Sequence, residues 1–423
     1  MKLYSFGVLI AIVLVWKQQV SAFQSGQVLA VLPRTSRQVQ ILQNLTTTYK
    51  VVLWQPVTAE LIAKQNEVHF FVNASDVSNV KSLLNESRIP FSVSIEDVEE
   101  LIRQQTLNDT VSPRGASSYY EQYHSLNEIY SWMEVITENY PNMVEKIHIG
   151  SSFEKHPLYV LKISGKEQRA KSAMWIDCGL HGREWISPAF CLWFVGYVTQ
   201  FYGKDKLYTN LLKHMDFYVM PIVNVDGYDF TWKKDRMWRK NRSFHGNSFC
   251  VGTDLNRNFA SKHWCEEGAS SLPCSEVYCG LYPESEPEVK AVADFLRRNI
   301  NQVKAYISIH SYSQTIIFPY SYSRTKTKDH EELSLLASEV ARAIQRTSKN
   351  VIYKHGRGSE SLYLAPGGGD DWIYDLGIKY SFTIELRDKG KYGFLLPESF
   401  IKPSCTEALT AVSKIAWHVV RNV

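Results

Sequence analysis

Three residues suited to metal binding or acid–base chemistry each follow, or end, an apolar and strand-like segment of the sequence. They are His181, His310 and Glu385. In open α/β sheets, ligands bind beyond the carboxyl ends of the strands. We therefore expect these three side chains to meet in one crevice.

The segment His181-Gly-Arg-Glu184 adds a carboxylate three residues after the first histidine, close enough for both side chains to bind one ion. Catalytic zinc takes three protein ligands and keeps a fourth position open. The set His181, Glu184 and His310 meets that requirement, and we predict one Zn²⁺ per chain. A lone His-x-x-Glu pair or a lone histidine would be weak evidence. Because Trp185 follows Glu184, the inverted zincin pattern His-x-x-Glu-His does not apply.

Five motifs in chain order resemble those of the pancreatic-type zinc metallocarboxypeptidases. They are His181-x-x-Glu184, Asn224-Val-Asp-Gly227, Asp254-Leu-Asn-Arg-Asn-Phe259, His310-Ser-Tyr312 and Phe382-Thr-Ile-Glu-Leu-Arg387. The resemblance covers residues 115–423, and residues 23–114 resemble the inhibitory propeptide of the same family. Five motifs in one order make a chance agreement negligible.

The resemblance assigns catalytic roles to two charged residues. Glu385, a carboxylate in an otherwise apolar strand, matches the general base that takes a proton from water and delivers it to the leaving amine. The alternative for this residue is a structural ion pair with Arg387. Arg239 matches the arginine that stabilises the developing oxyanion. Only its position in the motif distinguishes it from Arg236 and Arg242, which otherwise read as solvated surface arginines.

An exopeptidase must bind a terminal carboxylate, and a planar guanidinium suits that task. By resemblance, Asn256 and Arg257 form this clamp, and Tyr363 is a mobile tyrosine that closes over the substrate. The glycine run 367–369 supplies backbone freedom for such a loop. Further substrate-binding positions are matched by Arg183, Tyr312 and Phe394.

Asp370 stands where the resemblance places the floor of the specificity pocket. A carboxylate there favours C-terminal Lys or Arg by ion pairing, whereas an apolar residue would favour aromatic or aliphatic side chains. Adjacent Asp371 leaves an alternative open, because either aspartate could cap a turn or helix before Trp372. The spacing from Tyr363 selects Asp370. The sequence therefore predicts a B-type carboxypeptidase whose substrates are peptide and protein C-termini ending in Lys or Arg.

Other functions remain as alternatives. An A-type carboxypeptidase for apolar C-termini is opposed by Asp370. A secreted non-enzymatic binding protein on a peptidase scaffold would have lost a metal ligand or the base. The three predicted metal ligands and the predicted base Glu385 are all present. A hydrolase with paired carboxylates and no metal would leave two histidines unexplained, and EDTA would not affect its activity. The net charge of +4 is too mild for a nucleic-acid partner.

The residues before these motifs predict a small α+β domain. Strands are expected at residues 28–32, 50–54, 68–72 and 91–95, helices at 36–45 and 77–84, and a last helix after the final strand. This is the β-α-β-β-α-β order of a split βαβ, ferredoxin-like fold. Asp76 is expected to cap the second helix.

The larger part of the chain predicts an α/β domain. A capping box at Ser125 and Glu128 opens its first helix. Apolar runs at 174–176, 217–225, 305–309 and 381–386 then alternate with helical stretches that include 287–299 and 331–348. This pattern favours a mixed, mainly parallel sheet with helices on both faces, as in metallocarboxypeptidases.

The N-terminus has the features of a signal peptide at residues 1–22. Lys2 precedes an apolar run at 6–16, and small residues precede the expected cut before Phe23. The run is too short to span a bilayer, and no later stretch is long enough to be a membrane anchor. We expect a secreted protein. Resemblance to plasma members of the family implies a location in blood plasma and the removal of C-terminal lysines from fibrin.

Residues 108–118 are polar and small, which is typical of a linker. Pro113-Arg114-Gly115 within it is a candidate site for a trypsin-like activating protease. Proline before Arg114 suits thrombin, and plasmin or trypsin could also cut there. We expect this cut to separate the propeptide (23–114) from the catalytic domain (115–423).

Asn-x-Ser/Thr sequons and cysteines fit a secretory route. The sequons are at Asn44, Asn73, Asn85, Asn108 and Asn241. Seven cysteines allow three disulfides in an oxidising compartment. Cys178 and Cys191 flank the candidate site, Cys405 is expected to be free, and three pairings stay open within the cluster of Cys250, Cys265, Cys274 and Cys279.

Overall fold

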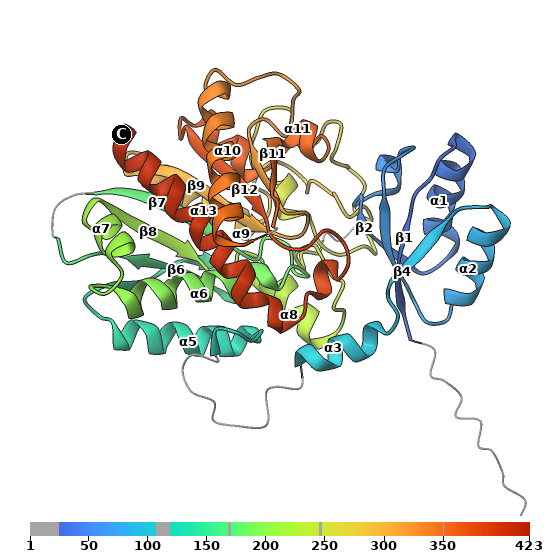
Figure 1. The fold of residues 1–423 in the computed structure, drawn as a ribbon, viewed down its shortest axis with the longest axis horizontal. Coiled ribbons are helices and arrows are strands. Elements are labelled where there is room, and N and C mark those ends of the chain that lie inside the picture. Colours follow the sequence, from blue (N-terminus) through green and yellow to red (C-terminus); the bar gives the residue numbers. More distant parts are fainter. Residues whose placement is uncertain (1–24, 107–118, 168–170, 245–247, 350) are drawn as a thin grey trace, which may run out of the picture.

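The computed structural model describes residues 25–106, 119–167, 171–244, 248–349 and 351–423 of the 423-residue chain. The predicted signal peptide, the linker with Arg114 and the sequon at Asn108 lie outside these ranges. Figure 1 shows a small domain, in blue, beside a large domain, in green to red. Within the described ranges, no helix is both long and apolar enough to cross a membrane.

The small domain has the predicted order of elements. They are β1 (Gln27–Val31), α1 (Ser36–Thr48), β2 (Val51–Gln55), β3 (Val68–Val72), α2 (Val77–Glu86), β4 (Phe91–Ile95) and α3 (Val98–Thr106). The strands form an antiparallel sheet in the order β2-β3-β1-β4. Alternate residues of β1 point to opposite faces, so Leu29 and Val31 pack under α1 and α2, while Val28 packs toward the large domain.

The helix caps of the small domain differ from the expectation. Asp76 precedes α2 as predicted, but its side chain makes no cap hydrogen bond. Its Oδ2 instead accepts from the Lys50 N–H at 3.0 Å. Asp76 is therefore the N-cap residue as predicted, but its carboxylate binds a backbone donor from outside the helix. Thr35 does cap α1, since its hydroxyl accepts from the Gln38 N–H at 3.2 Å.

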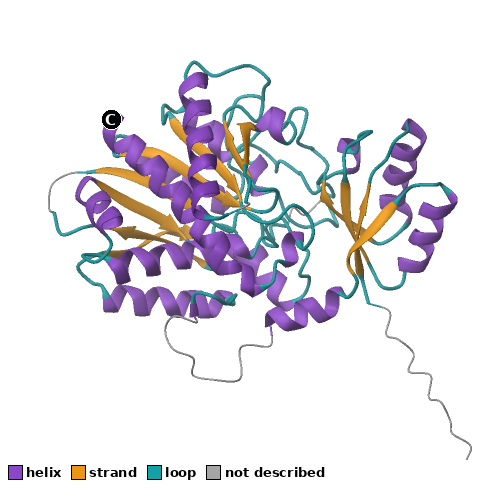
Figure 2. Ribbon diagram, viewed as in Figure 1, coloured by secondary structure: helices purple, strands orange, loops and turns teal. Residues whose placement is uncertain are grey.

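The large domain consists of a sheet covered by helices (Figure 2). Its helices are α5 (Leu126–Asn139), α6 (Ile186–Phe201), α7 (Lys206–His214), α8 (Val225–Lys233), α9 (Pro287–Arg298), α10 (His330–Thr347), α11 (Gly358–Ser361), α12 (Gly369–Asp375) and α13 (Ile401–Asn422). Its strands are β5 (Val144–Ser151), β6 (Pro157–Ile163), β7 (Ser172–Asp177), β8 (Met215–Met220), β9 (Val303–His310), β10 (Thr315–Phe318), β11 (Lys354–Arg357) and β12 (Tyr380–Glu385).

The sheet of the large domain is mixed and mainly parallel at its centre, which confirms the predicted fold class. Among the described residues its order is β11-β10-β12-β9-β7-β8-β6-β5. The four central strands, β12, β9, β7 and β8, are parallel. Strands β10 and β6 flank them in the antiparallel sense. The outer strands were not predicted. Strands β10 and β11 have four residues each and β5 lacks a continuous apolar run, whereas β6 was missed despite its apolar run at 158–161.

Two local predictions for the large domain had different outcomes. The capping box forms at α5, where the Glu128 carboxylate accepts from the Ser125 N–H at 2.7 Å. The strand predicted at 217–225 is too long, because β8 ends at Met220. Asn224 begins α8 instead, and its side-chain oxygen accepts from the Gly227 N–H at 2.9 Å.

All seven cysteines lie within the described residues. Disulfides join Cys178 to Cys191, Cys250 to Cys274 and Cys265 to Cys279. Cys405 is free and buried in α13. The two disulfides of the cluster tie down the loop between α8 and α9, which carries Asn256 and Arg257.

The sequons have two different environments. Asn44, Asn73 and Asn85 are exposed on the small domain. Asn241 in the large domain is 0% exposed, and its Nδ2 donates to Glu286 at 2.7 Å and to Glu288 at 3.1 Å. The predicted glycosylation at Asn241 was wrong for this fold, because the nitrogen that a glycan would join is enclosed and already bound.

Candidate functional site

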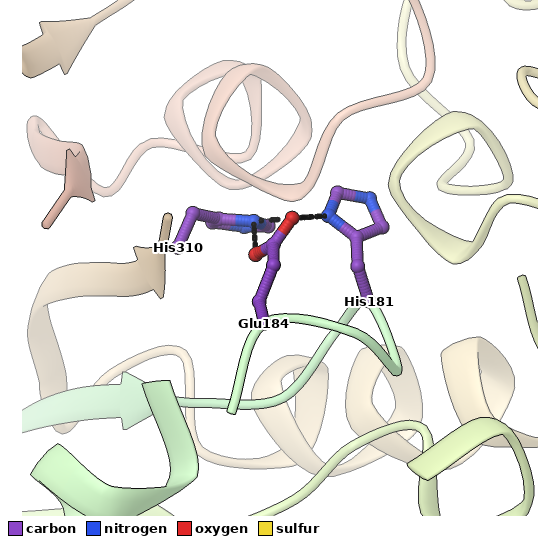
Figure 3. Close-up of side chains that lie close together, drawn as sticks. All are labelled: His181, Glu184 and His310. Atoms are coloured by element: carbon purple, nitrogen blue, oxygen red, sulfur yellow. Dashed lines mark hydrogen bonds and ion pairs between the residues drawn. The ribbon is translucent and has the colours of Figure 1, made fainter. Parts of the chain in front are cut away.

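The three predicted metal ligands lie together at the carboxyl ends of neighbouring strands (Figure 3). His181 and Glu184 come from the loop between β7 and α6, and His310 ends β9. Glu184 Oε1 is 2.7 Å from His181 Nδ1, Glu184 Oε2 is 3.0 Å from His310 Nδ1, and the two Nδ1 atoms are 3.2 Å apart. Tetrahedral zinc with bonds near 2.05 Å separates its ligand atoms by about 3.3 Å. The donor set and its spacing therefore fit zinc.

The remaining nitrogen of each imidazole faces a hydrogen-bond partner, as in established zinc sites. His181 Nε2 lies 3.1 Å from Asp254 Oδ1. His310 Nε2 lies 3.0 Å from Ser308 Oγ, and that hydroxyl is 2.6 Å from Asp177 Oδ1. Sequence reasoning did not single out Asp254, Ser308 or Asp177. The position of Asp254 within a family-like motif was the one available signal.

The residues of the triad shift one another's pKa values, because their charges are opposite and close together. Burial acts to raise the pKa of Glu184, but His181 and His310 hold it well below its usual range. Burial acts to lower the pKa of His310, but the Glu184 carboxylate raises it to about 9. In the metal-free protein this histidine is therefore protonated at neutral pH, so metal binding must displace a proton.

Glu385 ends β12 beside the triad, because the parallel register pairs it with His310 on β9. Burial raises the pKa of Glu385 to about 8; His310 opposes this shift and Glu184 adds to it. Within the described residues, its Oε2 has no hydrogen-bond partner. The alternative ion pair with Arg387 is not formed, because Arg387 Nε donates to Glu407 at 3.0 Å. An unpaired buried carboxylate oxygen is free to exchange a proton with a ligand.

Arg239 is fixed at the site by both its main chain and its side chain. Its carbonyl oxygen accepts from the Gly182 N–H at 2.9 Å and from Asn224 Nδ2 at 3.2 Å. Its Nη2 donates to Asp254 at 2.8 Å, and its Nη1 is 3.9 Å from Glu184. Burial acts to lower the pKa of Arg239, but Asp254 raises it, so the guanidinium stays charged.

The two neighbouring arginines point elsewhere. Arg236 donates to the main-chain oxygens of Arg183 at 2.8 Å and Phe394 at 2.7 Å, and its guanidinium lies over the Trp185 ring. Arg242 lies over the Phe230 ring. The geometry therefore selects Arg239 among the three.

All of the predicted substrate residues except Arg183 share one cavity of about 90 Å³ with the triad. The Arg257 guanidinium is fixed by two hydrogen bonds to main-chain oxygens. Its Nη1 donates to the Asn256 oxygen at 2.9 Å, and its Nε donates to the Gly268 oxygen at 3.0 Å. Within the described residues, its buried Nη2 has no partner. Tyr363 lies with its ring 5.8 Å from this guanidinium. The cavity lining includes Arg239, Asn256, Arg257, Tyr312, Tyr363, Asp370, Glu385 and Phe394.

The two adjacent aspartates have separate tasks. Asp370 lines the cavity, and its carboxylate accepts from Thr383 Oγ1 at 3.2 Å and from the Asp371 N–H at 2.9 Å. The Asp371 carboxylate accepts from the main-chain N–H groups of Ser321 at 2.8 Å and Tyr322 at 2.7 Å. Asp370 therefore faces the space that a substrate side chain would take, and Asp371 holds a loop.

The small domain covers this cavity with apolar side chains. Trp54 packs edge-on against Phe394 and Tyr312, with ring centroids 5.2 and 6.4 Å apart. His69 Nδ1 lies 2.9 Å from the Tyr312 hydroxyl. Arg183, predicted as a substrate residue, does not line the cavity, because it is buried against the Phe394 ring at 4.3 Å. The cover thus lies over the positions predicted to bind substrate.

Comparisons with known proteins match both domains. A family model described as zinc carboxypeptidase matches residues 129–411, and one described as carboxypeptidase activation peptide matches residues 29–105. Carboxypeptidase B2 of Bos taurus is 77% identical over 423 residues, 100% of either chain. Carboxypeptidase B of Rattus norvegicus is 44% identical over 397 residues, 94% of either chain. A crystal structure of thrombin activatable fibrinolysis inhibitor superposes with a TM-score of 0.93 and 78% identity, over 95% of this chain and 100% of that one.

Proposed function

The chain belongs to the zinc carboxypeptidase family and carries that family's activation peptide, and we propose that it is the secreted precursor of an enzyme that removes Lys or Arg from the C-termini of peptides and proteins. Asp370 carries the proposed specificity, because its carboxylate lines the cavity that also contains Arg257 and Glu385. A buried carboxylate attracts a cationic side chain and disfavours an apolar one. The 77% identity to Carboxypeptidase B2 supports the same specificity.

Arg257 is the group for the terminal carboxylate of the substrate. Its guanidinium is buried and fixed by Asn256 and Gly268, and its Nη2 has no partner among the described residues. A substrate carboxylate that accepts hydrogen bonds from the Arg257 guanidinium and from the Asn256 side-chain amide would give Nη2 a partner. An internal peptide bond presents no carboxylate to this pair, so the clamp selects chain ends. Tyr363 would close over the bound residue.

The reacting bond would lie between the triad, Glu385 and Arg239. When held by His181, Glu184 and His310, zinc supplies a Lewis acid for water and for the scissile carbonyl. Glu385 accepts the proton of the attacking water on its unpaired oxygen and then gives it to the leaving amine nitrogen. Arg239 donates an N–H to the developing oxyanion and stabilises its charge.

The small domain is proposed to keep this enzyme inactive during secretion. It covers the cavity through Trp54 and neighbouring residues. Cleavage of the linker after Arg114 by a trypsin-like protease, with thrombin and plasmin as the candidates, would permit the cover to leave. Similarity to a protein named thrombin activatable fibrinolysis inhibitor supports thrombin as the activator and a role in restraining fibrinolysis. We further propose blood plasma as the location and fibrin C-terminal lysines as a substrate, from the motif resemblance.

The test is hydrolysis of matched peptides that end in Arg, Lys, Phe or Leu. The full chain is assayed before and after limited thrombin or trypsin treatment, with and without a zinc chelator. We expect chelator-sensitive release of Arg and Lys that appears only after cleavage. An Arg114→Gln chain is the control, because it keeps the linker and lacks the cleavage residue.

The other outcomes separate the alternatives. Preferential release of Phe or Leu would contradict the role of Asp370 and favour an A-type enzyme. Lack of release by a cleaved and zinc-loaded sample would favour a non-enzymatic binding protein.

A further inference from the structure

The two histidines of the triad are supported in different ways. His181 Nε2 faces the carboxylate of Asp254 directly, at 3.1 Å. His310 Nε2 faces the hydroxyl of Ser308 at 3.0 Å, and the Asp177 carboxylate lies behind that hydroxyl at 2.6 Å. An ionised carboxylate can only accept a hydrogen bond, whereas a hydroxyl can donate or accept one. The support of His310 therefore depends on a neighbouring group that fixes the direction of the Ser308 O–H bond.

The sheet itself builds this second chain of contacts. Ser308 and His310 are two residues apart on β9, so their side chains emerge on the same face of the strand. Asp177 ends the neighbouring strand β7, and the parallel register pairs it with Ser308. All three side chains are buried. Their relative positions are thus set by two adjacent strands in the centre of the sheet.

Trp175 fixes which oxygen of Asp177 is available to Ser308. The indole Nε1–H is a donor only, and it lies 2.7 Å from Asp177 Oδ2. That oxygen is therefore an acceptor, and Oδ1 remains for Ser308. The Ser308 hydroxyl donates its single hydrogen bond to an ionised Asp177, which leaves an oxygen lone pair to face His310 Nε2. In the neutral imidazole that binds a metal, His310 must then carry its single proton on Nε2 and keep Nδ1 without one.

We propose that Asp177 and Ser308 are positioning residues that fix His310 in the Nε2–H tautomer and so keep Nδ1 available as a metal ligand. Nδ1 is the nitrogen that lies 3.0 Å from Glu184 and 3.2 Å from His181 Nδ1. The proposal requires zinc binding by the triad, but it does not depend on which C-terminal residue the enzyme removes.

The decisive variant is Asp177→Asn in the full chain. Its side-chain oxygen must face the Trp175 donor, so its amide NH₂ must face Ser308 and donate to it. The Ser308 hydroxyl then turns its proton toward His310 Nε2, which favours the tautomer with the proton on Nδ1. Ser308→Ala removes the relay without imposing the wrong tautomer. Loss of a group that supports a zinc ligand typically weakens metal binding by about 10 to 100-fold.

The experiment measures the rate at which a chromogenic chelator removes zinc from each folded variant. We expect the rate to rise about 10-fold for Ser308→Ala and about 100-fold for Asp177→Asn. Ser308→Thr, which keeps a hydroxyl, should restore slow release. Ser413→Ala is the matched control, because Ser413 is a buried serine of α13 that donates to the Thr410 oxygen at 2.9 Å and does not line the cavity of the triad.

Cobalt provides a second readout. The visible spectrum of the Co²⁺-substituted chain should change for Asp177→Asn, because the ligand nitrogen or its orientation changes, and should be unchanged for Ser413→Ala. Zinc release from folded Ser308→Ala at the parent rate would overturn the proposal, even if Asp177→Asn fails to fold. Equal release rates for folded Ser308→Ala and Asp177→Asn would also overturn it, because Asp177 would then not set the direction of the hydroxyl. Neither result depends on peptide specificity, so the proposed function is tested separately.

Discussion

The small and large domains face each other with opposite chemistry. The large domain presents ionisable groups to the cavity, among them Arg239, Arg257, Asp370 and Glu385. The small domain presents residues 54–57, which are a tryptophan, a glutamine, a proline and a valine. In the described part of the chain, no hydrogen bond or ion pair joins residues 54–57 to those four charged groups. The cover therefore excludes substrate without imitating its carboxylate or its cationic side chain.

This difference indicates how inhibition and catalysis are kept separate. Groups for recognition and chemistry, such as Arg257 Nη2 and Glu385 Oε2, are left without partners among the described residues while the cover is in place. The cover is held instead by apolar and aromatic contacts around Trp54 and by hydrogen bonds from His69 and Gln105 to the large domain. Changes in the large domain should therefore alter catalysis strongly, whereas changes in the small domain should alter access or stability by smaller factors.

The largest effect is expected for Glu385→Gln in the large domain. The amide cannot accept the proton of the attacking water, so kcat of the activated enzyme should fall by about 1,000-fold or more. Zinc content should be unchanged, because Glu385 is not part of the triad. Steady-state kinetics on a peptide ending in Arg, with metal analysis of the same sample, checks both points.

The matched control for this change is Glu339→Gln. Glu339 pairs with Lys414 at 2.8 Å on the surface, with its side chain 39% exposed. Its replacement should leave kcat unchanged. A Glu385→Gln enzyme with kcat within 10-fold of the parent would contradict the assignment of the base.

The next effect concerns specificity and compares two neighbouring residues. Asp370→Asn removes the charge that faces the cavity, and the ratio of kcat/KM for C-terminal Arg over Phe should fall by about 100-fold. Asp371→Asn removes a charge that binds main-chain N–H groups of Ser321 and Tyr322, and it should lower stability with little change in this ratio. A larger change of the ratio in Asp371→Asn would transfer the specificity role to that residue.

The apolar runs and their ends predicted that His181, His310 and Glu385 share one crevice, whereas the catalytic roles of Glu385 and Arg239 rested on the motif resemblance. The adjacency of β9 and β12, which pairs His310 with Glu385, is a property of the fold. Asp254, Ser308 and Asp177 were missed, because their roles arise from contacts between distant segments. A sequon describes three consecutive residues and contains no information on burial, which explains the wrong expectation for Asn241.

The cover was predicted as a domain, but its contacts were not. Nothing local in the sequence distinguishes Trp54 or His69 from residues of the small domain's own core. Their role depends on which face of β2 and β3 meets the large domain. The same limit applies to Asp76, whose partner at Lys50 lies in another element.

An intermediate effect is expected when the cover itself is weakened. Trp54→Ala removes an aromatic side chain that packs on Tyr312 and Phe394. After cleavage at Arg114, the small domain should leave more readily, with a Kd for the large domain raised about 30-fold, which corresponds to about 2 kcal/mol. Retention of the cleaved small domain on the immobilised large domain measures this change.

Leu32→Ala is the control for the cover. Leu32 is an apolar residue of the small domain that is 37% exposed, outside the cluster around Trp54. It should not change retention. Unaltered retention of the Trp54→Ala domain would mean that other contacts, such as His69 with Tyr312, hold the cover.

The smallest expected effect is on stability, and it comes from the residues at the start of α5 in the large domain and of α2 in the small domain. In the large domain, the His124 imidazole, whose Nδ1 lies 3.9 Å from Glu128 Oε2, and hydrogen bonds from Ser125 lower the pKa of Glu128 to about 2. Since the unfolded pKa is about 4.3, the carboxylate stabilises the fold above that pH, and this stabilisation is lost as pH falls toward 2. The side chain is 38% exposed, so solvent screening reduces the contribution to about 1 kcal/mol.

Glu128→Gln should therefore lower the thermal midpoint of the large domain at pH 7 by a few degrees, and the difference from the parent should shrink as pH approaches 3. Asp76→Ala in the small domain removes only the acceptor for the Lys50 N–H, so a loss of about 1 kcal/mol is expected there without any change in the large-domain midpoint. A Glu128→Gln difference that stays constant from pH 7 to pH 3 would show that the capping box acts through neutral hydrogen bonds. The charge of Glu128 would then not distinguish the start of α5 from that of α2.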